Sequence, residues 1–190
     1  DHKGDPEGKK ISARKTVEAM YELSQGGKIP IMCDTSSCTH TLIRDVKDAL
    51  SDENRKKYEA LKIIDITEWL DTIVMPRLKV TKPKGKILLH PTCASKIIGV
   101  DGFMKSVAHK CAKEVVLPVN THCCGAAGDR GFLFPKVAEA ATRDEREEIA
   151  GETFDGCYSL ARTCEISMMD TIARPYEGLI YLVDETTAAK

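Results

Sequence analysis

The chain has 190 residues, of which 42% are hydrophobic and 30% charged, so it is long enough to bury a substantial core in one or two domains. Its 28 basic and 29 acidic residues leave a formal charge of -1, and no stripe of Lys and Arg with interleaved aromatic residues stands out, which argues against nucleic acid as the main partner. No apolar run reaches the roughly 18 residues of a membrane span, and the first ten residues lack the apolar core of a signal peptide. We therefore expect a cytoplasmic, reducing environment.

Short apolar runs alternate with amphipathic segments along the chain. The elements expected, in chain order, are a helix at 12–23, a strand at 29–33, helices after Thr39 or Thr41 and at 51–61, a strand at 62–66, a helix from Thr67, a strand at 85–90, a helix at 101–112, a strand at 114–119, a helix from Pro135, a strand near Phe154, a helix after Cys164 and a strand at 179–183. The charge run at 143–148 reads as a solvated helix face. This alternation predicts an α/β fold with a mostly parallel, Rossmann-like sheet.

Cysteine is the unusual residue type, at positions 33, 38, 93, 111, 123, 124, 157 and 164. A chain of this length without a secretory signal does not need disulfides, so clustered thiols indicate metal or redox chemistry. Ligands of parallel sheets bind beyond the carboxyl ends of the strands, and helix N-termini there favour thiolates. Cys93, Cys123, Cys124 and Cys164 all follow predicted strands, so we expect them to converge on one metal centre, whereas Cys33 and Cys111 are expected in the core.

A glycine-rich loop follows the paired cysteines. Gly125, Gly128 and Gly131 permit positive φ angles and close backbone approach, so that N–H groups can point at an anion or at sulfide. Phosphate is the alternative ligand for these N–H groups. We favour sulfide, because the loop lacks the Lys-Ser/Thr ending of a phosphate loop.

The sequence Cys123-Cys124-Gly125, preceded thirty positions earlier by His90-Pro91-Thr92-Cys93, resembles the cysteine-rich CCG domain family. The closest resemblance is to the C-terminal region of FAD-linked D-lactate dehydrogenases and to the glycolate oxidase iron–sulfur subunit. It covers about residues 28–184 and includes Arg162-Thr163-Cys164 and Arg174-Pro175-Tyr176.

The resemblance implies an iron–sulfur cluster held by Cys93, Cys123, Cys124 and Cys164, with Gly125, Gly128 and Arg130 beside it. It implies a complete CCG module at 85–190 and, at 1–84, part of a sister module truncated at its N-terminus. Cys38 is then a ligand only in an intact parent protein. The parent would add an FAD domain and a ferredoxin-like domain, with a cytoplasmic or peripheral membrane location.

The chain departs from the family pattern at one ligand, because Ala161 stands where the final C-x-x-C motif has its first cysteine. The centre is then a four-thiolate cluster, a rearranged site using Cys157, or a site for another metal. His90 and His122 are further candidate ligands, although satisfying backbone groups at a strand end is the simpler role for both.

No catalytic residue is predicted, since no base stands beside a carboxylate-binding Arg and no G-x-G-x-x-G follows a strand. The expected function is the electron-transfer region of a flavin-dependent 2-hydroxy-acid oxidoreductase, with substrate oxidation in a domain outside these residues. Two alternatives stay open. One is a zinc-binding structural or docking domain, and the other is a thiol-redox module that uses Cys123 and Cys124.

Overall fold

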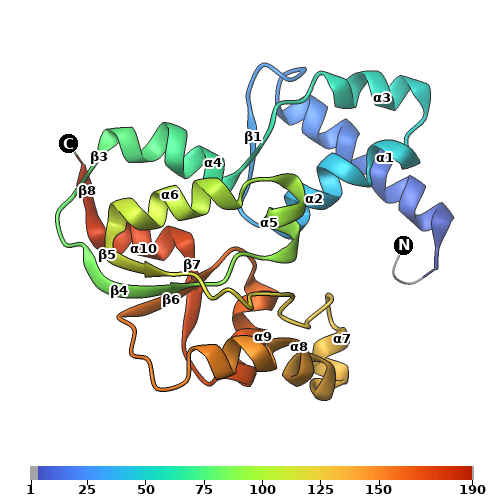
Figure 1. The fold of residues 1–190 in the computed structure, drawn as a ribbon. Helices are drawn as coiled ribbons and strands as arrows, with labels where there is room; N and C mark the ends of the chain where they lie inside the picture. Colours follow the sequence, from blue (N-terminus) through green and yellow to red (C-terminus); the bar gives the residue numbers. More distant parts are fainter. Residues whose placement is uncertain (1–3, 190) are drawn as a thin grey trace.

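The computed structural model describes residues 4–189 and shows an α/β fold built on parallel strands (Figure 1). The strands are β1 (Ile31–Cys33), β2 (Ile63–Asp65), β3 (Leu78–Val80), β4 (Lys84–Leu89), β5 (Ala112–Val116), β6 (Gly156–Ser159), β7 (Tyr176–Gly178) and β8 (Thr187–Ala189). The central sheet has the order β5-β4-β6-β7, and each neighbouring pair in it is parallel. The predicted fold class is thereby confirmed.

Helices connect these strands. They are α1 (Pro6–Leu23), α2 (Ser36–Arg44), α3 (Asp52–Glu59), α4 (Ile66–Trp69), α5 (Cys93–Ile98), α6 (Asp101–Cys111), α7 (Arg130–Leu133), α8 (Pro135–Glu148), α9 (Arg162–Ile172) and α10 (Leu179–Thr186), with 3-10 turns at Lys47–Ala49 and Met75–Arg77 and a π-helical turn at Leu70–Val74.

Two apolar layers enclose the central sheet because successive side chains of β4 point to opposite faces. Ile87 and Leu89 pack under α6 and α10 in one layer, whereas Leu88 packs with Cys157 and Met168 on the α9 side. All three β4 side chains are fully buried. Figure 1 shows α6 and α10 above the sheet and α8 and α9 below it. Cys111 lies in the first layer, as the sequence predicts.

The N-terminal part has its own small parallel pair, β1 with β2, and its own core around Val17 and Leu42. It contacts the rest through α2, which packs against α5. The Ser36 backbone N–H also donates to the Leu160 carbonyl at 3.3 Å. The division into modules at 1–84 and 85–190 stays a prediction.

Three predicted helix starts are wrong, and one predicted strand is a helix. Helix α2 begins at Ser36, with Thr35 as its N-cap, and not after Thr39 or Thr41. Helix α1 begins at Pro6 and not at Ser12, because Asp5 caps it by accepting from the Gly8 N–H at 2.8 Å. Residues 179–183 form α10 instead of a strand, since β7 ends at Gly178 and the apolar run continues as a buried helix. The helix expected after Cys164 begins at Arg162 and contains that cysteine.

The charge run at 143–148 is also not entirely solvated. Glu145 is only 1% exposed, because the buried face of α8 repeats through Ala138 and Thr142 to this residue. Within residues 4–189, no helix is both long and apolar enough to cross a membrane.

Replacing Leu88 by Ala tests the packing of the central sheet. Leu88 is fully buried between β5 and β6, so Leu88→Ala is expected to lower the free energy of unfolding by about 3 kcal/mol. Leu133→Ala is the matched control, because Leu133 is 69% exposed and its loss should cost less than about 0.5 kcal/mol. Urea denaturation followed by circular dichroism measures both, and equal losses would contradict the assignment of the core.

Candidate metal centre

Cys93 stands at the start of α5, just beyond the carboxyl end of β4. Thr92 caps this helix, with its hydroxyl oxygen accepting from the Ser95 N–H at 3.1 Å. Cys93 is the first residue of α5, where the helix leaves backbone N–H groups unpaired, and its sulfur accepts a hydrogen bond from the Ala94 N–H.

Cys123 and Cys124 lie in the loop between β5 and α7. The Lys96 ammonium group on α5 donates a hydrogen bond to the Thr121 carbonyl at 2.6 Å and so connects this loop to α5. Gly125 then turns the chain with φ +75°, and a Cβ at this position would lie 2.5 Å from the Ala138 Cα. The close approach to α8 therefore requires glycine here.

Cys164 sits in the first turn of α9 and faces the same loop. The Ser167 hydroxyl, one turn later, donates to the Cys124 carbonyl at 2.6 Å and holds the loop against the helix. The Cys124 and Cys164 Sγ atoms are 3.0 Å apart, and both residues are buried. Residues forty positions apart thus meet in one place.

The four thiols form a continuous series of contacts, from Cys93 to Cys123 to Cys124 to Cys164. Hydrogen bonds from Cys124 and then Cys93 lower the pKa of the Cys123 thiol well below its usual range. The hydrogen bond to Cys123, and then burial, raise the pKa of the Cys93 thiol. Hydrogen bonds to Cys123 and Cys164, and then burial, raise the pKa of the Cys124 thiol. Cys123 is consequently the member of this group of thiols that loses its proton most readily, because Cys93 and Cys124 donate hydrogen bonds to its sulfur.

Backbone N–H groups point at three of these sulfur atoms. The Gly125 N–H donates to the Cys123 Sγ at 3.4 Å, and the N–H groups of Ala94 and Ala126 donate to Cys93 and Cys124. Such bonds stabilise thiolates and also tune the potential of a thiolate-bound cluster. The loop after Cys124 therefore presents the N–H groups of Gly125 and Ala126 to cysteine sulfur.

Among the described residues, no hydrogen bond joins the remaining candidates to these sulfur atoms. Cys38 is exposed on α2, and His122 is exposed in the loop just before Cys123. Cys157 is buried within β6, where desolvation raises its pKa to about 11, and it belongs to the same apolar layer as Cys124 and Cys164. Gly128 turns the exposed part of the loop with φ +76°, and Arg130 is exposed at the start of α7.

Across residues 4–189, no three His, Cys, Asp or Glu side chains are already arranged around a point that one metal ion could occupy. One reason for this absence is that the Cys124 and Cys164 sulfurs are only 3.0 Å apart. Two thiolates on one tetrahedral ion at about 2.3 Å stand roughly 3.7 Å apart, so these sulfurs must separate to share a metal. The residue types fit a metal centre, while the sulfur positions are those of thiols in mutual contact.

His90 and Glu145 form a buried pair close to the sulfurs. The His90 Nδ1 lies 2.9 and 3.2 Å from the two Glu145 carboxylate oxygens, and its Nε2 has no partner within the described chain. The expectation that the His90 ring satisfies backbone groups is wrong. Sequence reasoning missed Glu145, although the spacing of Ala138, Thr142 and Glu145 on one helix face was available as a signal.

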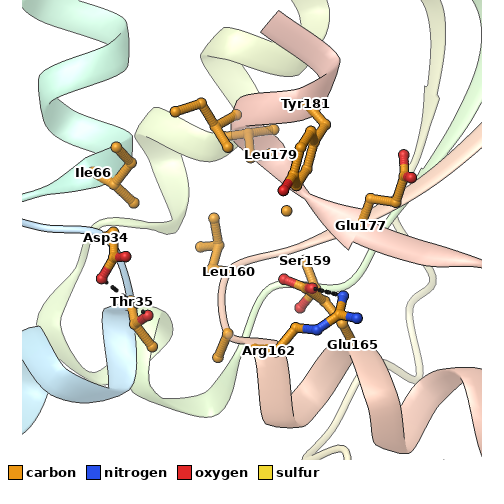
Figure 2. A pocket seen from close by; sticks show the side chains of 13 residues that line it. Asp34, Thr35, Ile66, Ser159, Leu160, Arg162, Glu165, Glu177, Leu179 and Tyr181 are labelled. Atoms are coloured by element: carbon orange, nitrogen blue, oxygen red, sulfur yellow. Dashed lines mark hydrogen bonds and ion pairs between the residues drawn. The ribbon is translucent and has the colours of Figure 1, made fainter. Parts of the chain in front are cut away.

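A cavity of about 730 Å³ opens beside α9, whose first turn also carries Cys164. Figure 2 shows Asp34 and Thr35 facing the segment from Ser159 to Arg162, with Tyr181 above. Its charged lining consists of Asp34, Glu165 and Glu177 against one cation, Arg162, which pairs with Glu165 at 2.9 Å. An acidic lining of this kind disfavours an anionic guest such as a carboxylate substrate.

No protein-family model matches the chain, and no curated protein sequence matches it. The geometry described above is therefore the basis for the assignment of function.

Mild oxidation of the metal-free protein is expected to link Cys124 to Cys164. Their sulfurs are 3.0 Å apart, so closing a disulfide of about 2.05 Å needs little movement. Diamide would accept the two electrons and two protons that the thiols release. Peptide mapping by mass spectrometry should find this link, and Cys164→Ala should abolish it. A first disulfide between two other cysteines would contradict the geometry.

The lowered pKa of Cys123 predicts alkylation that depends little on pH. A thiol with an ordinary pKa near 8.5 reacts about tenfold faster per unit of pH below that value, because only the thiolate attacks. In the reduced, metal-free protein, iodoacetamide should modify Cys123 at a rate constant within about twofold between pH 5.5 and 7.5. N-acetylcysteine serves as the reference. Cys93→Ala removes one donor and should restore part of the pH dependence, and a tenfold rise per unit in the unmodified protein would refute the assignment.

Proposed function

We propose that this chain is the iron–sulfur electron-transfer region of a flavin-dependent 2-hydroxy-acid oxidoreductase of the D-lactate or glycolate type. The observation that carries the proposal is the series of contacts among Cys93, Cys123, Cys124 and Cys164, which come from three separate segments at one edge of a parallel sheet. Ordinary core thiols, such as Cys111, lie singly among aliphatic side chains.

The surroundings of the four thiols suit a cluster. An iron–sulfur cluster, when bound, supplies one-electron transfer at a potential set by its ligands, hydrogen bonds and exposure. The four cysteines would hold it, and the N–H groups of Ala94, Gly125 and Ala126 would stabilise negative charge on sulfur. Cys93 and Cys123 are exposed while Cys124 and Cys164 are buried, so the centre spans from the surface into the core.

The flavin-dependent half of the proposal has a different support, namely the resemblance of residues 28–184 to the CCG family. A flavin in a separate domain would take hydride from the hydroxy acid, and this region would pass the electrons onward singly, together with a ferredoxin-like domain. The acidic lining of the cavity beside α9 agrees with substrate oxidation taking place elsewhere.

Thiol–disulfide chemistry is a second candidate function, and one specific observation favours it. The Cys124 and Cys164 sulfurs are already 3.0 Å apart, and Cys123 next to them has the lowered pKa of an attacking thiolate. A redox module of this type would cycle between dithiol and disulfide without metal. A zinc-binding domain is a third candidate, using three of the thiols with His90, and it would bind zinc without labile sulfide.

Anaerobic reconstitution with ferrous iron and sulfide separates these functions. The full chain is expected to take up iron and acid-labile sulfide together and to give an EPR signal in one oxidation state. Cys123→Ser should lower both contents at least about tenfold, because it removes the sulfur that contacts two of the others.

Cys38→Ser is the matched control, since Cys38 is an exposed thiol on α2 outside the sulfur series, and it should leave the uptake unchanged. Iron and sulfide that fail to bind, or that bind equally to Cys123→Ser, would overturn the proposal. A stable zinc content without sulfide would instead support the structural site.

A further inference from the structure

The His90–Glu145 pair is unusual because both polar side chains are almost completely buried. Each residue is 1% exposed, and the described structure gives the Glu145 carboxylate no other hydrogen-bond partner than the His90 ring. Burying a carboxylate and an imidazole costs several kcal/mol unless both are fully partnered. We therefore expect a further interaction at the atom of this pair that has no partner.

The atom without a partner is the His90 Nε2. It is buried, and no donor or acceptor of residues 4–189 forms a hydrogen bond with it. The ring cannot easily turn away, because Glu145 holds Nδ1 from one side and the Tyr176 ring meets it edge-on, with centroids 6.4 Å apart and planes at 89°. The backbone is fixed as well, since the His90 N–H donates to the Tyr158 carbonyl and the His90 carbonyl accepts from Ser159.

The location of His90 connects it with the sulfur atoms. It is the first residue beyond β4, in the turn that leads directly to Cys93, at the edge of the sheet where the four thiols meet. A fixed, buried nitrogen beside the four thiols has the properties of a ligand atom whose partner is a metal and not a protein group.

We propose that the Nε2 of His90 is a metal ligand of the cysteine centre, with Glu145 as the residue that positions it. The proposal rests on the proposed function and deepens it by adding a nitrogen donor to the four sulfurs. The Nδ1 proton is donated to the Glu145 carboxylate, which leaves the Nε2 lone pair free for the metal. The Glu145 carboxylate then serves as the acceptor that fixes the tautomer and the orientation of the ligating ring.

Other residues meet these conditions less well. His122 is adjacent to Cys123, but it is exposed, so water can satisfy its ring. Cys157 is buried within β6, and no hydrogen bond to the four thiols is found for it among the described residues. His90 alone among the three combines burial, a fixed ring and an unpartnered ligand atom.

Pulsed EPR of the reconstituted full chain labelled with ¹⁵N-histidine tests the proposal directly. Metal-bound imidazole gives a strongly coupled nitrogen, and we expect to observe one. The chain has five histidines, so a variant with the other four, at positions 2, 40, 109 and 122, changed to Gln should keep the coupling. His90→Gln should lose the coupling, and the readout from the unmodified chain holds even if this variant folds poorly.

Glu145→Gln tests the positioning role. It is nearly isosteric but lacks the negative charge, so it should keep the nitrogen coupling, shift the midpoint potential and weaken iron retention against a chelator about 10- to 100-fold. Glu147→Gln on the exposed face of the same helix is the matched control and should change neither.

The outcomes separate this inference from the proposed function. A cluster signal without strong nitrogen coupling, or with only the weak coupling of an N–H donor, would overturn the role of His90 as a ligand and leave the electron-transfer function intact. Absence of iron and sulfide from the unmodified chain would overturn both. A Glu145→Gln variant with unchanged potential and iron retention would overturn the role of Glu145.

Discussion

Parallel pairing of β4 with β5 on one side and β6 on the other is the interaction on which the candidate site depends. Parallel strands all end at the same edge of a sheet, so the segments that follow them start from neighbouring points. Cys93, the paired cysteines and Cys164 each belong to one of these three segments. Without this pairing, thiols separated by up to 71 positions would have no reason to meet.

The site is shaped as much by burial as by topology. Cys124 and Cys164 belong to the apolar layer under β4, and Gly125 presses the loop against α8 so tightly that no side chain fits. This packing places backbone N–H groups on sulfur and leaves His90 and Glu145 shut off from water. In such surroundings every unpaired polar atom is costly, so the unpartnered Nε2 of His90 is informative about function.

Much of the fold could be predicted from the sequence, and the errors have identifiable causes. Strand β4 and helix α8 stand out because a buried apolar run and a proline at a helix start are strong local signals. The segment at 179–183 was predicted as a strand because a short apolar run is ambiguous, and only its packing against α6 makes it a helix. Glu145 was placed on a solvated face because its neighbours in the sequence are charged.

The sequence by itself determined the alternation of strands and helices, the positions of Cys93, Cys123, Cys124 and Cys164 beyond strands, and the glycines that let the loop turn, because all of these follow from local periodicity and backbone freedom. Only the tertiary structure decided which sulfurs touch and that His90 faces Glu145. Those contacts join residues 40 and 55 positions apart, and their geometry comes from the register of the sheet and the packing of α8 and α9, which no local pattern encodes.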